Sequence, residues 1–411
     1  MYFQLAWRNI WRNSRRTLTI LTAIFVGVTS MIFLSSLTRG VMEGMVENAI
    51  DNLTGHIRIQ NPEYRRDPAI ENRIQNPESL IRAMASILPD GAKQVQRIRV
   101  DGVLNTARET SGVVMVGIEP EKEKGCSFIG DATLEGRFFD DDDKNGVVLG
   151  KAMMEKLGTR IGRKIVLMSQ DTEGEIASKA FRIRGVYHSE MASTEKIFVF
   201  VPLRAMQRML KAGEGVTEIT LTLPDKDISQ TDLSPLTTAI NQELGQTSFR
   251  AEHWREMLPA ISAYLEMFQG FLFIWYLVIF VAMGFGLVNT VLMAVYERMR
   301  EFGLLKALGM RPIRIFRMVL RETLFLLALG ISAGNVVAFI CIWLLSDTGI
   351  DLSAFSQGTD MWGISRVILP VLNGGDVLIA NVTVLLLGLI VGVYPAIRAA
   401  SFTPVETMRQ L

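Results

Sequence analysis

Four long apolar runs constrain the fold of this chain more than any other feature of its sequence. They cover Thr17–Leu37, Phe268–Val295, Thr323–Leu345 and Val377–Ile397. Each reaches the roughly 20 residues that an α-helix needs to cross about 30 Å of hydrocarbon. A helix also satisfies its own backbone hydrogen bonds in lipid. The sequence therefore predicts a membrane α-helical protein with four transmembrane helices.

A polar stretch, Gly40–Glu266, separates the first two apolar runs. Alternating apolar and polar residues predict strands in it, at His56–Gln60, Val113–Ile118, Lys164–Met168, Ile197–Val201 and Ile219–Leu223. Helical periodicity marks other segments, at Asn76–Leu88, Lys151–Leu157 and Leu203–Lys211. We therefore expect a large mixed α/β extracytoplasmic domain between the first and second helices. Trp254–Gln269 is predicted to continue as one helix into the second crossing.

Basic residues beside the apolar runs indicate the orientation of the chain. Met1–Arg16 carries four arginines and no acid, and Tyr296–Glu322 carries seven Lys or Arg residues. The connection Ser346–Asp376 carries only Arg366. Lys and Arg accumulate in cytoplasmic loops, so both termini are predicted to be cytoplasmic and the large domain periplasmic. The basic excess therefore indicates topology, and no nucleic-acid partner is expected.

The segment before the first apolar run predicts a helix lying in the membrane surface. Its apolar residues share one helical face, and its arginines lie elsewhere: Phe3, Trp7, Ile10 and Trp11. The first run is longer than a usual signal-peptide core, and no clear Ala-x-Ala site follows it. We interpret it as an uncleaved anchor.

Gly330-Ile-Ser332-Ala-Gly334 matches the G-x-S-x-G motif of hydrolases. That motif needs a strand–turn–helix, but this match lies inside an apolar run. Gly330 and Gly334, like Gly388 and Gly392 in the fourth run, form a small-xxx-small pattern that favours close helix packing. For Asn289, Asn335 and Asn381, each within a predicted crossing, we favour interhelical hydrogen bonds over a substrate path.

Motifs for metals and nucleotides are incomplete in this sequence. Asp141-x-Asp143-x-Asn145-Gly146 begins like a calcium loop, but its twelfth position is Ala152 instead of Glu. The three histidines are isolated, and Gly150-Lys151 does not belong to a Walker A motif. We expect no metal, no cofactor and no catalytic residue on this chain. A membrane-anchored enzyme would need a nucleophile–base pair or a metal cluster, and neither is found in the sequence.

Glu297–Arg317 is a cytoplasmic segment with an apolar face that a purely topological signal would not need. Its apolar residues are Leu304, Leu305, Leu308, Ile313 and Phe316. Gly309 and Pro312 interrupt it, which predicts a helix–turn–helix. We expect this element to dock a partner or to lie along the membrane.

Three motifs resemble the FtsX/MacB-type permeases of ABC transporters. They are Asn289-Thr-Val-Leu-Met, Glu297-Arg298-x-x-Glu301-Phe-Gly303-x-Leu-x-Ala307-Leu-Gly309-Met and Tyr394-Pro395-Ala396-x-x-Ala399-Ala400-x-x-x-Pro404-Val405-Glu406. One crossing before the large domain and three after it also match that family. The resemblance implies three parts: residues 1–39, a MacB-like periplasmic domain of two subdomains at 40–266, and an FtsX-like permease domain at 267–411.

The resemblance also implies a partner ATPase, which would carry ATP and Mg²⁺ and bind a coupling helix within 297–317. Carried onto this sequence, the coupling residues are Glu297, Arg298, Glu301, Lys306, Gly309, Arg311 and Arg314. Four crossings are too few for a pore, so a second permease copy or paralogue is expected, in the bacterial inner membrane. The length resembles the LolC/LolE branch, which releases lipoproteins. The alternative is a MacB-like mechanotransmitting efflux permease or a cell-envelope signalling permease.

Overall fold

The computed structural model describes residues 14–140, 143–189, 192–224, 231–245, 247–355, 358 and 364–402. The predicted N-terminal surface helix, most of which precedes residue 14, and the Pro404-Val405-Glu406 motif lie outside these residues. The chain divides into two compact units. We call Met1–Val41, Tyr264–Asp351 and Val367–Leu411 the helical unit, and Met42–Ala263 and Leu352–Arg366 the sheet unit.

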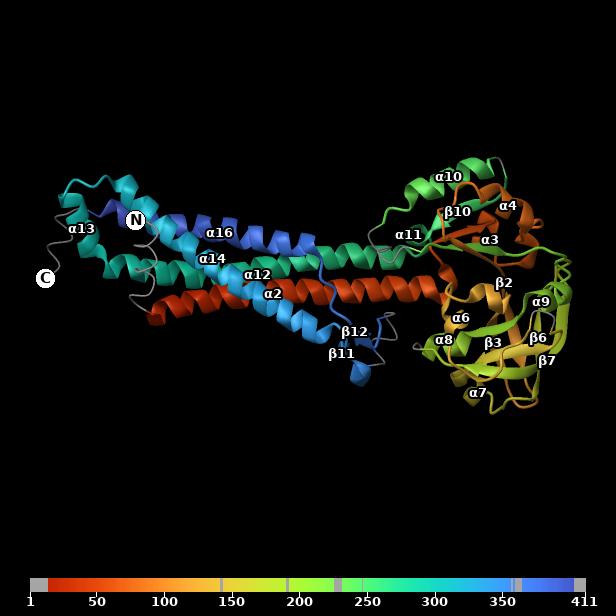
Figure 1. Ribbon diagram of the computed structural model, residues 1–411. Helices are drawn as coiled ribbons and strands as arrows, with labels where there is room; N and C mark the ends of the chain where they lie inside the picture. The colour runs from red at the N-terminus through yellow and green to blue at the C-terminus, as the bar shows by residue number, and fades with distance from the viewer. Residues whose placement is uncertain are drawn as a thin grey trace. The chain divides into compact units, whose positions relative to one another are not determined.

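Four long helices make up most of the helical unit and lie side by side (Figure 1). They are α2 (Ser14–Ala49), α12 (Pro259–Glu297), α14 (Pro312–Leu345) and α16 (Gly374–Ser401). All four are long and apolar enough to cross a membrane, as the apolar runs predict. At about 1.5 Å per residue, the 36 residues of α2 span roughly 54 Å, which exceeds the hydrocarbon thickness. The boundary between the two units falls inside α2 and inside α12.

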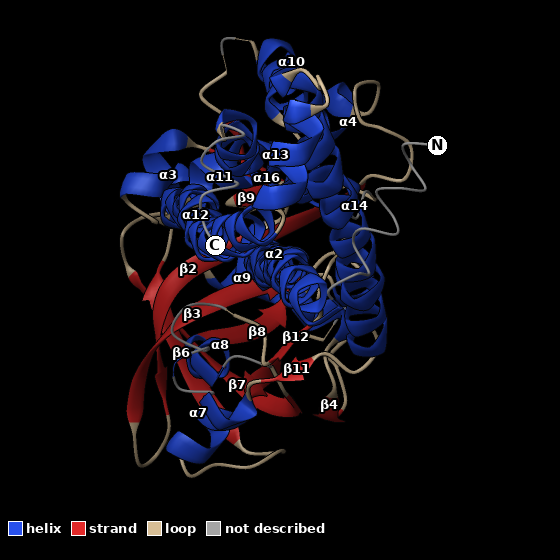
Figure 2. Ribbon diagram, turned by 90° about the vertical axis from the view of Figure 1, so that its left-hand side faces the viewer, coloured by secondary structure: helices blue, strands red, loops and turns tan. Residues whose placement is uncertain are grey.

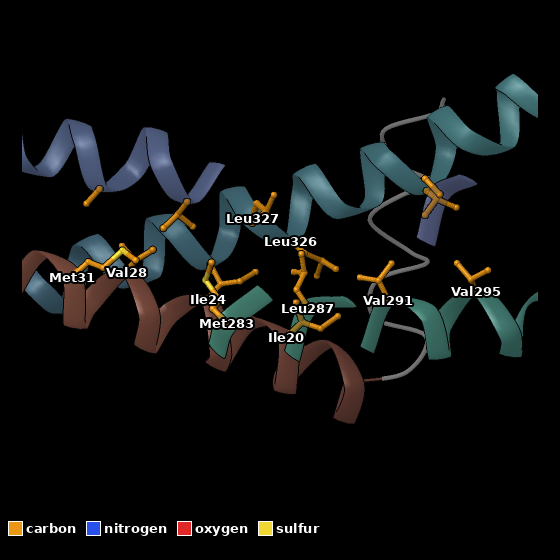
Figure 3. Close-up of a cluster of buried hydrophobic side chains, with 14 of the residues drawn as sticks. Ile20, Ile24, Val28, Met31, Met283, Leu287, Val291, Val295, Leu326 and Leu327 are labelled. Carbon is orange, nitrogen blue, oxygen red and sulfur yellow. The ribbon is translucent and has the colours of Figure 1, made fainter. Parts of the chain in front are cut away.

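Buried aliphatic side chains hold the helical unit together. Ile20, Ile24, Val28 and Met31 of α2 meet Met283, Leu287, Val291 and Val295 of α12, with Leu326 and Leu327 of α14 beside them (Figure 3). Many large apolar side chains on the other faces of these helices are exposed. An exposed apolar surface of this kind suits lipid contact.

The segment Trp254–Gln269 is not one continuous helix, so that prediction is wrong. The short helix α11 (Trp254–Met257) ends at Leu258, which has φ −120° and ψ 65°, and α12 begins at Pro259. A proline disfavours helical geometry in the residue before it, and it fits the first turn of a helix. The break therefore follows from the Leu258–Pro259 pair.

The sheet unit is built on ten connected strands, with helices packed around them (Figure 2). The strand order is β10-β1-β9-β2-β3-β8-β5-β7-β4, and β6 pairs with β2 and β7. The strands are β1 (Ile57–Gln60), β2 (Lys93–Asn105), β3 (Thr110–Ile118), β4 (Leu134–Gly136), β5 (Gly146–Gly150), β6 (Lys164–Gln170), β7 (Ile176–Tyr187), β8 (Phe198–Pro202), β9 (Glu218–Thr222) and β10 (Arg250–His253). The sheet mixes parallel and antiparallel pairs, which matches the expected mixed α/β class.

Short helices connect these strands. They are α3 (Pro62–Arg66), α4 (Pro77–Met84), α5 (Pro120–Glu123), α6 (Phe128–Asp131), α7 (Lys151–Lys156), α8 (Ala192–Ile197), α9 (Leu203–Met209) and α10 (Ser234–Leu244). An aromatic cluster packs between helix and sheet around Phe128, Tyr187, Phe198 and Phe200. In the helical unit, a two-stranded pair, β11 (Ile350–Asp351) and β12 (Val367–Ile368), lies between α14 and α16 in the chain.

A fully buried ion pair links β2 to α5 in the sheet unit. Arg97 is 0% exposed and Glu123 is 1% exposed. The Arg97 guanidinium donates to both carboxylate oxygens of Glu123, at 2.7 and 2.8 Å. Its Nη1 also donates to the carbonyl oxygen of Leu53, at 2.9 Å. Two parallel hydrogen bonds of this kind are among the strongest that side chains form.

Candidate coupling site

α13 (Met299–Ala307) lies at one end of the helical unit, between α12 and α14 (Figure 1). α12 ends at Glu297, and Arg298, with φ −101° and ψ 12°, precedes α13. A turn then leads to α14, which starts at Pro312. The predicted helix–turn–helix within Glu297–Arg317 is therefore confirmed.

Gly309 ends α13 by its backbone conformation. Its φ is 89°, which glycine adopts far more readily than other residues. The N–H of Gly309 donates to the carbonyl of Lys306, and the N–H of Met310 donates to the carbonyl of Leu305, both at 2.9 Å. This is the Schellman pattern of helix ends. A Cβ at Gly309 would meet no atom within 4 Å, so a substitution there acts through backbone strain.

Arg298 joins α13 to α14 through an ion network. Its Nε lies 3.0 Å from Glu301 and its Nη1 lies 2.8 Å from Glu322 on α14. The guanidinium also lies over the Phe302 ring, 5.3 Å from the centroid. Arg298 is only 7% exposed, so this charge stabilises the corner between the helices.

Lys306 links α13 to the C-terminal end of α16 by hydrogen bonds. Its Nζ donates to the backbone carbonyl oxygen of Phe402, at 2.6 Å, and to that of Ala400. A cation near a helix C-terminus is also favoured by the helix dipole. Tyr296 and Phe402 pack ring against ring, with centroids 5.8 Å apart. The element is thus held by three long helices at once.

The apolar residues of this element face in two directions. Phe302 and Ile315 are buried in the core of the helical unit, and Leu305 and Phe316 pack against that core. Leu304, Leu308 and Ile313 are 63%, 77% and 49% exposed. We call these three residues the coupling face. Exposed Arg311, Arg314 and Arg317 lie next to it in the chain. Exposed apolar side chains with a polar rim are typical of a protein-binding surface.

The seven predicted coupling residues therefore fall into two sets. Glu297, Glu301, Gly309, Arg311 and Arg314 are exposed, and each can lie on a binding surface. Arg298 and Lys306 are less exposed and bind groups of this chain, so they position α13, and their contact with a partner stays a prediction. Local sequence pattern could not indicate this role, because the Lys306 acceptor Ala400 lies 94 residues away.

A small cavity lies behind α13, lined by Thr17, Arg298, Phe302, Glu322 and Thr323 among others. Its volume is about 20 Å³, enough for about one water molecule. Water there could hydrate the Arg298 network. The cavity is too small for a transported molecule.

The glycines of the small-xxx-small patterns lie where helices approach closely. A Cβ on Gly330 would lie 2.6 Å from Ile24, and one on Gly334 would lie 2.8 Å from Val28, both on α2. The corresponding distances are 2.5 Å from Gly388 to Leu327 and 2.9 Å from Gly392 to Thr323. The Thr29 hydroxyl donates to the Gly334 carbonyl at 3.1 Å. α14 is thus packed between α2 and α16 at glycine contacts.

Replacing Gly330 by alanine is expected to destabilise the helical unit by about 1–3 kcal/mol, because the methyl group overlaps Ile24. Thermal unfolding of the detergent-solubilised protein measures this. Gly286→Ala on α12 is the matched control, since a Cβ there meets no atom within 4 Å. The control should be neutral or slightly stabilising. Equal melting temperatures for the two variants would contradict the close-packing assignment.

Two of the three intramembrane asparagines pair as predicted. Asn335 of α14 and Asn381 of α16 exchange side-chain hydrogen bonds of 2.9 and 3.1 Å. Asn289 is exposed on α12 and does not join this pair. The interhelical interpretation is confirmed for the first two residues only.

The hydrolase-like motif lies in a helix, and the described part of the calcium-loop motif binds groups of this chain. Gly330–Gly334 lies inside α14, where no nucleophile elbow can form. Asp141 and Asp142 lie outside the described residues, and Asp143 accepts from Arg184 at 3.0 Å and from the Asn145 N–H. The described part of the chain contains no group of three His, Cys, Asp or Glu side chains that could hold a metal ion.

The fold and this site define a membrane protein with four helices that can span a bilayer and a large α/β unit. Two family models match the chain: the MacB-like periplasmic core domain over residues 17–232 and the FtsX-like permease C-terminal domain over residues 273–404. The first covers more than half of the chain. The chain belongs to the FtsX/MacB family of ABC transporter permeases.

Individual relatives of known name share less than a quarter of their aligned residues with this chain. The chain is 22% identical to the lipoprotein-releasing system transmembrane protein LolC of Neisseria meningitidis serogroup B, over 96% of this chain and 94% of LolC. It is 23% identical to the macrolide export ATP-binding/permease protein MacB of Escherichia coli K12, over 98% of this chain but only 60% of MacB. The solved periplasmic region of MacB from Actinobacillus actinomycetemcomitans matches 52% of this chain and 94% of its own, at 16% identity and a TM-score of 0.35.

Proposed function

We propose that this chain is the permease subunit of an ABC transporter that releases lipoproteins from the inner membrane. A partner dimer of ATP-binding subunits, carrying ATP and Mg²⁺, would bind the coupling face. A second permease copy or paralogue would complete the membrane part. The observation that carries the proposal is the similarity to LolC, which runs along 96% of this chain and 94% of LolC.

The coupling site supports an ATP-driven mechanism of this kind. Leu304, Leu308 and Ile313 offer an apolar surface, and Arg311 and Arg314 offer charges that a partner can pair. Arg298 connects the same element to α14, Lys306 connects it to the end of α16, and α12 leads directly into it. Closure of the partner ATPases would therefore move the ends of three long helices together. No substrate channel through the membrane is required.

The orientation follows from the basic segments. Tyr296–Glu322 contains α13 and seven Lys or Arg residues, and such residues accumulate in cytoplasmic loops. The ATPases would then bind on the cytoplasmic side, and the sheet unit would act in the periplasm. Both termini would be cytoplasmic, in a multi-pass protein of the inner membrane.

Release can be tested in proteoliposomes. They would contain the full-length chain, the ATP-binding subunit and second permease encoded beside it, and a fluorescently labelled lipoprotein. We expect ATP and Mg²⁺ to move the label into the soluble fraction when a periplasmic carrier protein is present. Removing Mg²⁺ with EDTA should stop the release, because ATP hydrolysis needs the metal. The matched control is the same labelled polypeptide without its acyl chains.

The alternative function is MacB-like efflux, supported by 23% identity over 98% of this chain. It predicts ATP-driven export of a macrolide by the same proteoliposomes and no lipoprotein release. That result would replace the lipoprotein proposal and leave the permease family unchanged. A third outcome, ATP hydrolysis with neither transport activity, would favour envelope signalling.

A further inference from the structure

The sheet unit contains an open pocket that the coupling mechanism does not use. It holds about 300 Å³ and lies among β1, β2, β9 and α3. Its lining is mostly polar and includes Arg58, Gln60, Tyr64, Arg99 and Glu218. A concave site of this size has room for a small molecule, and its polar lining favours a polar or charged one.

The charges around this pocket are only partly paired. Arg58, Arg97 and Arg99 lie near two buried acids, Glu123 and Glu218, and the exposed Asp101 also lines the pocket. Arg97 pairs with Glu123, and Arg58 Nε lies 3.4 Å from Glu218. Arg99 forms no ion pair with any residue in the described ranges, and its guanidinium lies only over the Phe198 ring, at 5.2 Å. Arg99 is therefore the arginine of this group that has no ion pair in the described ranges.

The buried groups also lack hydrogen bonds. Glu218 is 0% exposed, and neither of its carboxylate oxygens accepts a hydrogen bond from the described residues. The Nε of Arg58 is buried and likewise donates none. Burial, together with the charges of Arg99 and Arg97, lowers the pKa of the Arg58 guanidinium. Unsatisfied buried polar groups are costly, so a bound molecule that pairs with them would be stabilised.

No other charged group at the pocket forms an ion pair with Arg99 in the described part of the chain. Arg65 on the rim pairs with Glu252 at 3.2 Å, so that pair is neutral. Asp101 lines the pocket but is exposed, and it forms no ion pair with Arg99 within 4 Å. The Tyr64 hydroxyl donates a hydrogen bond to the backbone carbonyl oxygen of Arg99 and so holds the backbone at that arginine.

We propose that this pocket binds a small ligand with an oxyanion group, a phosphate or a carboxylate, between Arg58 and Arg99. Guanidinium groups bind both kinds of oxyanion through paired hydrogen bonds. Donors on the ligand would then form hydrogen bonds with the Glu218 oxygens, which accept none from the described residues. The proposal concerns the sheet unit alone and does not depend on lipoprotein release.

The pocket adjoins the turn in which the helical path of α2 ends. Leu53 has a φ of 69°, an unusual value for a residue with a side chain. Its carbonyl oxygen accepts hydrogen bonds from Arg58 at 3.1 Å and from Arg97 at 2.9 Å. A ligand bound to Arg58 would thus contact a side chain that is itself hydrogen-bonded to this strained turn.

Isothermal titration calorimetry of the full-length protein in detergent tests this proposal. The probes are inorganic phosphate, acetate and glycerol 3-phosphate, which represent a free phosphate, a carboxylate and a lipid-headgroup phosphate. We expect saturable binding of at least one probe, and the strongest binder identifies the source. Arg99→Gln should weaken binding at least tenfold, while Arg108→Gln, an exposed arginine of the β2–β3 loop, should not.

Thermal unfolding of both variants shows whether they fold. Arg99 has no ion pair to lose among the described residues, so Arg99→Gln should unfold near the wild-type temperature. Absence of saturable binding for all three probes would overturn the proposal. Equal affinities of the wild type and a folded Arg99→Gln variant would also overturn it.

Discussion

Replacing Leu304 and Leu308 together by aspartate is expected to abolish co-purification of the ATP-binding subunit. The two side chains are 63% and 77% exposed, so the change should not disturb the fold of the helical unit. Docking would bury both carboxylates against an apolar surface. Burial of unpaired charges costs several kcal/mol, and about 2 kcal/mol already weakens binding roughly thirtyfold.

Ile176→Asp is the control for this experiment, because Ile176 is 73% exposed but lies on β7 of the sheet unit. It should retain the ATPase. Arg311→Glu, which reverses one charge beside the coupling face, should weaken the complex less than the double variant. If the double variant keeps wild-type amounts of ATPase and wild-type ATP hydrolysis, the coupling face has been assigned incorrectly.

Arg97→Met is expected to lower the free energy of unfolding of the sheet unit by about 3–5 kcal/mol. The variant leaves Glu123 buried without its partner, and that is the costly state of a buried ion pair. Pulse proteolysis of the full-length protein in urea measures the loss. Glu123 would also lose the two charge-assisted hydrogen bonds that it accepts from Arg97.

A double variant separates the ion pair from simple packing. Arg97→Met with Glu123→Leu removes both charges, so it should be more stable than Arg97→Met alone. The single variants Arg97→Met and Glu123→Leu each lower the free energy of unfolding. If these two losses add up to the loss in the double variant, the ion pair makes no specific contribution. A loss below about 1 kcal/mol in Arg97→Met would likewise contradict the assignment.

Periodicity and hydropathy were enough to predict much of this fold. All four membrane helices contain their apolar runs, and the five predicted strands correspond to β1, β3, β6, β8 and β9. The two longest strands, β2 and β7, were not predicted. β2 contains Arg97, which looks like a surface residue until Glu123, 26 residues later, is placed beside it. Local pattern cannot supply a partner that only the tertiary fold brings near.

The candidate site shows the same division. The turn at Gly309 and Pro312 could be predicted, because those residues have strong backbone preferences. The different exposure of Leu304 and Leu305 could not be predicted. Both belong to one apolar segment, and only packing decides which of them lies against the core. The pocket beside Arg58 was also missed, because its residues come from separate strands and a helix.

The central claim is that α13 passes ATPase motion into the helical unit through its internal contacts. Arg298→Met tests it most directly, because it breaks the contacts to Glu301 and Glu322 but keeps the coupling face. The measurement is the number of lipoprotein molecules released per ATP hydrolysed in proteoliposomes. We expect the variant to bind the ATPase and hydrolyse ATP but to release several-fold less lipoprotein per ATP than the wild type. A wild-type ratio in a variant that binds the ATPase normally would contradict the claim.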